Sequence, residues 1–174
     1  MFSKNIMIKT KDLKTQQKHF LIKAYPHSSQ LEIAIKKIKE NSTSNLQLSI
    51  LGKFTKEYIS KSKEERAIYE KELKHYWNGL LGSSQEFGLF KNPELGTVFI
   101  AGSLTSMFLH KIEGKALGAM SAGSYGILRG LGAYQLQAES YLKLLTKGSY
   151  LLIVRGYDDE LNSLEVILAK LDKE

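Results

Sequence analysis

Apolar residues that recur at every second position divide the chain into four predicted strands, at 19–25, 46–50, 96–102 and 149–155. The first strand has Phe20, Ile22 and Ala24 on one face and Leu21 and Tyr25 on the other, and the second alternates cleanly between apolar and polar positions. The last is apolar on both faces, which is typical of a central strand. A helix between the first two strands completes a β-α-β unit, whose connection we expect to be right-handed.

Capping boxes mark the starts of two predicted helices. Ser29 and Glu32 have the required spacing, as do Ser62 and Glu65. The second pair begins a charged helix over 62–81, which lies between two predicted strands. We interpret this helix as part of an insertion at about 55–85.

The remaining segments complete an α+β pattern. Residues 103–113 and 135–147 are expected to be helical, and a final helix follows Asp158. The stretch 83–96 has no steady period and predicts an ordered loop. The fold class predicted is a ferredoxin-like, four-stranded, mainly antiparallel sheet with helices on one face and an inserted charged helix.

Small residues recur at every fourth position in the middle of the chain. On a helix they would form one bare ridge: Gly114, Gly118, Ala122, Gly126 and Gly130. Each helical glycine costs about 1 kcal/mol relative to alanine, so we expect another backbone to pack closely against the ridge. The uncharged run 116–128 is shorter than the roughly 20 residues that span a bilayer. Contact with a membrane surface remains the alternative.

Several segments follow each other in a recognisable order: Gly96–Gly102, the Gly/Ala-rich stretch after it, Gly130–Gly132, Gln137–Tyr141 and Lys147–Val154. This order resembles that of the bacterial heat-induced or general stress protein domain family. The chain departs from the family in having Ser103 where a proline is often found, and in carrying the long charged helix.

The resemblance covers roughly residues 19–54 and 95–171. It implies a ferredoxin-like fold, a bacterial cytoplasmic setting and a loose link to stress. The family has no established catalytic residues, so the resemblance implies none here.

Composition limits the chemistry that this chain can perform. It contains no cysteine, which excludes disulfides and thiolate metal sites, and its start resembles no secretory signal, so a cytoplasmic location is expected. The 174 residues predict one domain at 19–174 after a basic arm at 1–18.

The net charge of +7 comes from the first half of the chain. A lysine-rich arm attracts phosphates or anionic headgroups, or serves only as a solubilising tail. Arginine, which reads base edges, occurs only at positions 66, 129 and 155, so specific nucleic-acid recognition is not expected.

His110 and Glu113 stand three positions apart, a spacing that can bind a metal on one helical face, with His75 or His27 as a possible third ligand. An incidental surface pair is the alternative, and we expect no metal, cofactor or catalytic residue. Arg129 lies among the glycines, where it could hold an anion or simply end a helical turn. His110, Glu113 and Arg129 are therefore the candidate pocket for a small ligand of unknown identity.

His75, Tyr76 and Trp77 form an aromatic cluster on the charged helix. Such a cluster marks either a partner-contact surface or packing against the sheet. Our functional hypothesis is a non-enzymatic interaction or regulatory module, self-associating as a homo-oligomer through sheet surface left uncovered. The alternatives are the small-ligand or metal-binding protein and a peripheral protein with weak membrane-surface contact.

Overall fold

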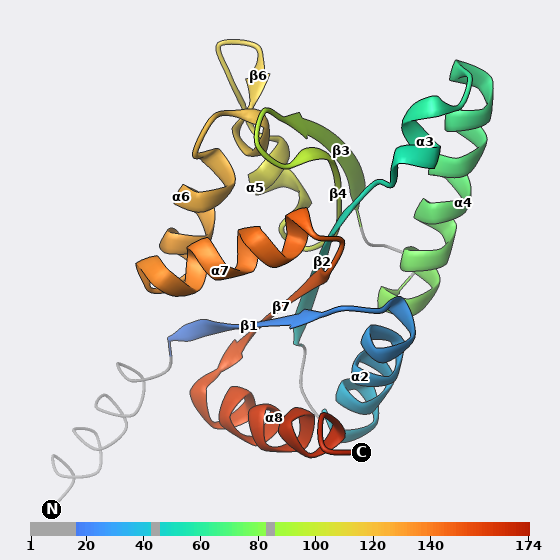
Figure 1. Ribbon diagram of the computed structural model, residues 1–174. Coiled ribbons are helices and arrows are strands. Elements are labelled where there is room, and N and C mark those ends of the chain that lie inside the picture. The colour runs from blue at the N-terminus through green and yellow to red at the C-terminus, as the bar shows by residue number, and fades with distance from the viewer. Residues whose placement is uncertain (1–16, 43–45, 83–85) are drawn as a thin grey trace, which may run out of the picture.

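The computed structural model describes residues 17–42, 46–82 and 86–174, and most of the predicted basic arm lies outside them. One antiparallel sheet has the strand order β1-β7-β2-β4-β3, and β5 and β6 form a separate hairpin (Figure 1). The strands are β1 (Lys18–Tyr25), β2 (Gln47–Lys53), β3 (Phe87–Asn92), β4 (Gly96–Gly102), β5 (Lys111–Ile112), β6 (Lys115–Ala116) and β7 (Tyr150–Tyr157). The helices are α2 (Ser28–Asn41), α3 (Lys56–Ser60), α4 (Lys63–Leu81), α5 (Thr105–Leu109), the 3₁₀ turn η1 (Leu117–Ala119), α6 (Gly123–Gly130), α7 (Gln135–Thr146) and α8 (Asp158–Leu171).

The sheet contains two pairs of parallel strands, each separated by one antiparallel strand. β1 and β2 run parallel because each pairs antiparallel with β7, which lies between them. The predicted β-α-β unit is therefore present, with β7 inserted between its strands. β4 and β7 are related in the same way around β2. The ferredoxin-like four-strand arrangement is not confirmed, since the sheet has a fifth strand and its first strand lies at an edge.

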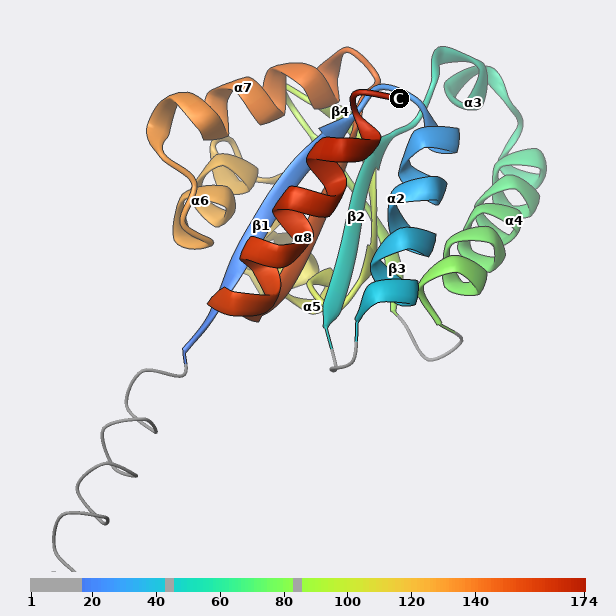
Figure 2. The ribbon, with the colours of Figure 1, turned by 90° about the horizontal axis from the view of Figure 1, so that it is seen from below.

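Helices cover both faces of the sheet (Figure 2). Along β7, Leu152 and Val154 enter one core with α2, α4 and α8, whereas Leu151 and Ile153 enter a second core with α5, α6 and α7. The central position predicted for this strand is confirmed. The expectation of helices on one face is wrong, because a strand that is apolar on both sides needs cover on both.

β3 is the strand that periodicity missed. The predicted loop over 83–96 contains this strand, which pairs with β4. Gly88 weakens the apolar alternation, so the pattern gave no strand signal. Buried Asn92 organises the turn that follows: its side-chain oxygen accepts from the Leu95 N–H at 3.1 Å, and its amide donates to the Gly118 carbonyl at 2.9 Å.

The predicted glycine ridge does not exist as one helix. A hairpin, a 3₁₀ turn and α6 divide the segment, and Gly114 lies in the hairpin turn at φ 81°. Only Gly118 has the expected close neighbour, because a Cβ there would lie 3.1 Å from the Phe108 carbonyl oxygen. Nothing lies within 4 Å of a Cβ built on Gly114, Gly126 or Gly130. The close-packing interpretation is thus wrong for most of the ridge.

The two capping boxes have different outcomes. The box at the start of α4 is confirmed, since Glu65 N–H donates to Ser62 Oγ and Ser62 N–H donates to the Glu65 carboxylate. The other box is wrong: the N-cap of α2 is His27, two residues before the predicted cap Ser29, and His27 makes no side-chain capping bond. The helix expected over 103–113 is also shorter and ends at Leu109.

Candidate functional site

The predicted pocket residues His110, Glu113 and Arg129 lie on three different elements. His110 follows the end of α5, Glu113 occupies the β5-β6 turn with φ 52°, and Arg129 belongs to α6. All three are exposed, and no hydrogen bond or ion pair joins their side chains in the described part of the chain. Arg129 instead donates from Nη1 to Tyr125 Oη at 3.3 Å.

The metal-binding alternative required His110 and Glu113 to share one helical face. The hairpin turn breaks that geometry, because the helix ends before His110. Within residues 17–42, 46–82 and 86–174, no three His, Cys, Asp or Glu side chains gather closely enough to hold a metal ion.

The aromatic cluster on α4 divides between core and surface. Trp77 is 1% exposed and packs on Phe99 and Tyr150, with ring centroids 5.8 Å apart in each case. Its role as a partner contact is therefore corrected to packing on the sheet, the alternative interpretation of this cluster. Tyr76 is partly exposed and donates to the Glu32 carboxylate of α2, whereas His75 faces solvent.

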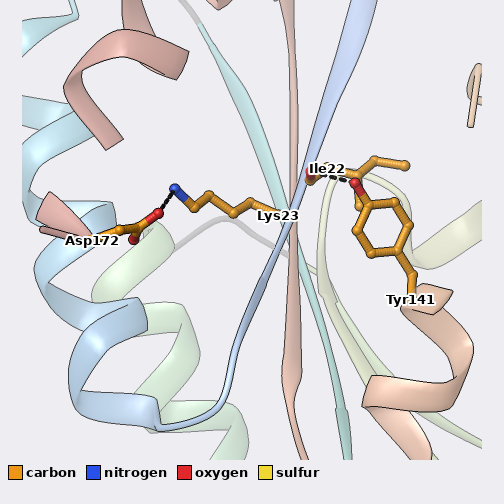
Figure 3. A network of polar contacts seen from close by, with 4 residues as sticks. All are labelled: Ile22, Lys23, Tyr141 and Asp172. Carbon is orange, nitrogen blue, oxygen red and sulfur yellow. Dashed lines mark hydrogen bonds and ion pairs between the residues drawn. The ribbon is translucent and has the colours of Figure 1, made fainter. Parts of the chain in front are cut away.

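The edge strand β1 is held from both faces of the sheet (Figure 3). Tyr141 of α7 donates its hydroxyl to the Ile22 carbonyl at 3.0 Å, and Lys23 pairs with Asp172 beyond the end of α8 at 2.5 Å. These two contacts tie the edge strand to α7 on one face of the sheet and to the segment after α8 on the other.

Two large apolar side chains stand out from the surface at the start of α7. Tyr134 and Leu136 are each 77% exposed, more than any other large apolar side chain in the described residues. Leu136 lies off the stripe that α7 buries, which includes Ala138 and Leu145. Its position on the helical wheel was available from the sequence, but only the structure shows that nothing covers it.

Among the residues that the structure describes, the groups with a clearly shifted pKa are tyrosines. Burial raises the pKa of Tyr25, Tyr141 and Tyr150, and burial followed by a hydrogen bond to Glu70 raises the pKa of Tyr58 to about 12. A general acid or base works best with a pKa near the working pH. These shifts move the pKa values of the tyrosines further from neutral pH and therefore do not point to acid–base catalysis.

Comparison with known proteins adds no family or activity. No protein-family model, no curated protein and no solved structure matches this chain. In the part of the chain that the structure describes, every helix is too short or too polar to cross a membrane.

Proposed function

We propose that this protein is a non-enzymatic interaction module that self-associates through the surface at the start of α7. The observation that carries the proposal is the exposure of Tyr134 and Leu136, two large apolar side chains with only one residue between them. Both side chains leave apolar surface in water at the same end of α7, and burying such surface against a partner is favourable. Because helices cover both sheet faces, we place the contact here and no longer on an open sheet face.

Charge favours a second copy as the occupant of this surface. The chain carries a net charge of +7, so two copies repel each other over most approaches. Residues 116–142, which include α6 and the start of α7, contain only Arg129 and Glu139 as charged side chains. Two copies can meet through this nearly neutral surface without bringing their lysines together.

The glycines of α6 support the same placement. Gly126 and Gly130 are exposed, and nothing in the protomer occupies the space where their Cβ atoms would lie. Each glycine lowers helix stability by about 1 kcal/mol relative to alanine, and no neighbouring atom within the protomer requires a glycine at either position. Close approach of side chains from a second copy would supply that requirement.

The expected affinity is modest. Full burial of one such side chain contributes about 1.5–3 kcal/mol, and a symmetric dimer buries four of them. Association itself costs about 4–15 kcal/mol in lost freedom of motion. The dimer should therefore depend on concentration rather than be permanent.

The test is sedimentation and light scattering at protein concentrations from about 1 µM to about 1 mM. This range detects dimers whose binding free energy is at least about 4 kcal/mol, which corresponds to a Kd of about 1 mM. The wild type should become dimeric, and Tyr134→Ser with Leu136→Ser should stay monomeric. Ile59→Ser with Ile68→Ser is the matched control, because these isoleucines of α3 and α4 are also more than half exposed. A wild type that is monomeric throughout, or equal effects of both variants, refutes the proposal.

Membrane-surface contact is the competing occupant of the same side chains. Co-sedimentation with anionic vesicles distinguishes it. If the wild type is monomeric and binds vesicles, and the double variant Tyr134→Ser with Leu136→Ser does not bind them, the surface at the start of α7 contacts lipid and not a second copy of the chain. The bacterial, cytoplasmic and stress-related setting is part of the proposal only through the resemblance described above.

A further inference from the structure

The outer edge of β3 has no strand beside it in the described part of the chain, because β3 stands last in the strand order of the sheet. The register shows which of its backbone groups are left over. Gly102 N–H donates to the Glu86 carbonyl at 2.9 Å, so every second residue from Glu86 onward exchanges hydrogen bonds with β4. The N–H and C=O groups of the alternate residues Phe87, Leu89 and Lys91 therefore point away from the sheet.

A cavity of about 520 Å³ lies against this edge. Phe87 of β3 lines it together with Lys74 of α4 and with Ser106 and Leu109 of α5. Because α4 and α5 lie on opposite sides of the sheet (Figure 1), a cavity that both of them line has to pass around the edge of β3. Leu109 lies directly over the strand, since a Cβ on Gly88 would come within 2.2 Å of its side chain. The edge of β3 is thus the floor of a groove with one helix on each side.

The two sides of this groove differ in chemistry. Side chains alternate along a strand, so Lys91 lies on the α4 side with Leu89, which packs against the core there. Lys74 and Lys91 make the α4 side basic, and neither ammonium group has an ion pair in the described part of the chain. Leu109 makes the α5 side apolar, and Glu86 is the one acidic residue among the described residues that line the cavity. An extended chain fits when its acidic side chains face α4 and its apolar side chains face α5.

We propose that β3 binds an extended segment of another protein, in which acidic and apolar residues alternate, as a sixth strand of the sheet. In antiparallel pairing, Leu89 and Lys91 would each exchange two backbone hydrogen bonds with this segment. Its acidic side chains would meet Lys74 and Lys91. None of these residues belongs to the surface at the start of α7, so the inference goes beyond self-association.

Charge disfavours a second copy as the occupant of this edge. Two chains of net charge +7 repel each other, and pairing of two β3 edges would bring two copies of Lys91 together. Lysine on an edge strand is a common means of preventing such pairing between like edges. An acidic segment, in contrast, is attracted by the same lysine.

The test is amide hydrogen exchange of the full chain, followed by NMR, with a short synthetic peptide of alternating valine and glutamate. In the protein alone, the amides of Leu89 and Lys91 should exchange quickly and those of Gly88 and Phe90 slowly, because only the latter two bond to β4. At about ten times its Kd, the glutamate peptide should slow exchange at Leu89 and Lys91 by about tenfold. A peptide with lysine in place of glutamate, and a glutamate peptide with N-methylated valines, should slow neither.

Charge variants test the side chains of the groove. Lys74→Gln and Lys91→Gln should each weaken binding of the glutamate peptide about two- to fivefold, the effect of one exposed ion pair, and Glu86→Gln should strengthen it. Lys170→Gln is the matched control, because it removes an exposed lysine of α8 outside the cavity. All four side chains are exposed, so these variants should fold normally.

Three results would overturn the proposal. The first is a glutamate peptide that slows exchange at neither amide, or a lysine peptide that slows it equally. The second is lysine variants of the groove that bind the glutamate peptide as the control does. The third is slow exchange at Leu89 and Lys91 without any peptide: a dependence on protein concentration would then identify a second copy as the occupant, and its absence would identify the chain itself.

Discussion

Alanine substitutions in the glycine segment should have opposite effects at two neighbouring positions. Gly126 lies within α6, where its N–H bonds to the Ala122 carbonyl at 2.9 Å, and a Cβ would meet nothing within 4 Å. Its φ is outside the left-handed region, so alanine fits the backbone. Gly126→Ala should therefore raise the free energy of unfolding by about 1 kcal/mol through helix propensity and a less flexible unfolded chain.

Gly123→Ala should have the opposite sign. A Cβ at Gly123 would lie 1.9 Å from the Leu117 carbonyl oxygen and 3.2 Å from Met120 Cβ. Backbone atoms cannot move aside as the end of a flexible side chain can. Overpacking of this kind costs about 1–3 kcal/mol.

Urea unfolding followed by circular dichroism measures both effects, at a protein concentration low enough to keep the chain monomeric. With a slope of about 2 kcal/mol per molar urea, the midpoint should rise by about 0.5 M for Gly126→Ala and fall by about 0.5–1.5 M for Gly123→Ala. A loss of stability in Gly126→Ala would mean that another part of the chain lies against α6. That result would refute the reasoning and restore the close-packing interpretation.

Three further predictions concern the core, the edge strand and alkaline pH. Trp77→Ala should cost about 3–5 kcal/mol by opening a cavity. Trp77→Phe should cost much less because its ring keeps most of that space filled, and the buried indole N–H lost in either variant has no partner; chemical denaturation measures both effects. Tyr141→Phe should lower stability by about 1 kcal/mol and speed hydrogen exchange in β1, with Tyr157→Phe as the neutral control; unchanged exchange would contradict the role of this bond. Burial and then the bond to Glu70 raise the pKa of Tyr58 from its ordinary value of 10.0 to about 12 in the folded state. The stability that this difference contributes should be fully present below pH 10 and should be lost as the pH rises toward 12. Tyr58→Phe should lessen that fall in denaturation experiments at alkaline pH, and an equal fall in this variant would exclude Tyr58 as its cause.

Strong periodicity predicted elements well, and interrupted periodicity did not. β7 could be placed at the centre of the sheet because its residues are apolar on both faces. β3 could not be recognised, since Gly88 and Lys91 interrupt its pattern and its stability comes from pairing with β4. The pairing partner of a strand is a long-range property that local patterns do not contain.

The candidate sites show the same limit. The spacing of His110 and Glu113 has meaning for metal binding only on a helix, and the left-handed turn at Glu113 and Gly114 replaces the helix with a hairpin. Ile22 and Tyr141, by contrast, contact each other although they are 119 positions apart. No sequence pattern connects such pairs, because the sheet order brings them together.

The sequence by itself determined the α+β class, four of the sheet strands, and the capping box of α4, because each depends on residues that are neighbours along the chain. The strand order, the second helical layer, the burial of Trp77 and the unpaired hydroxyl of Tyr25 were decided by tertiary structure alone. These properties depend on which distant segments come into contact, and the free energy of those contacts is gained only when the whole sheet and its two cores assemble.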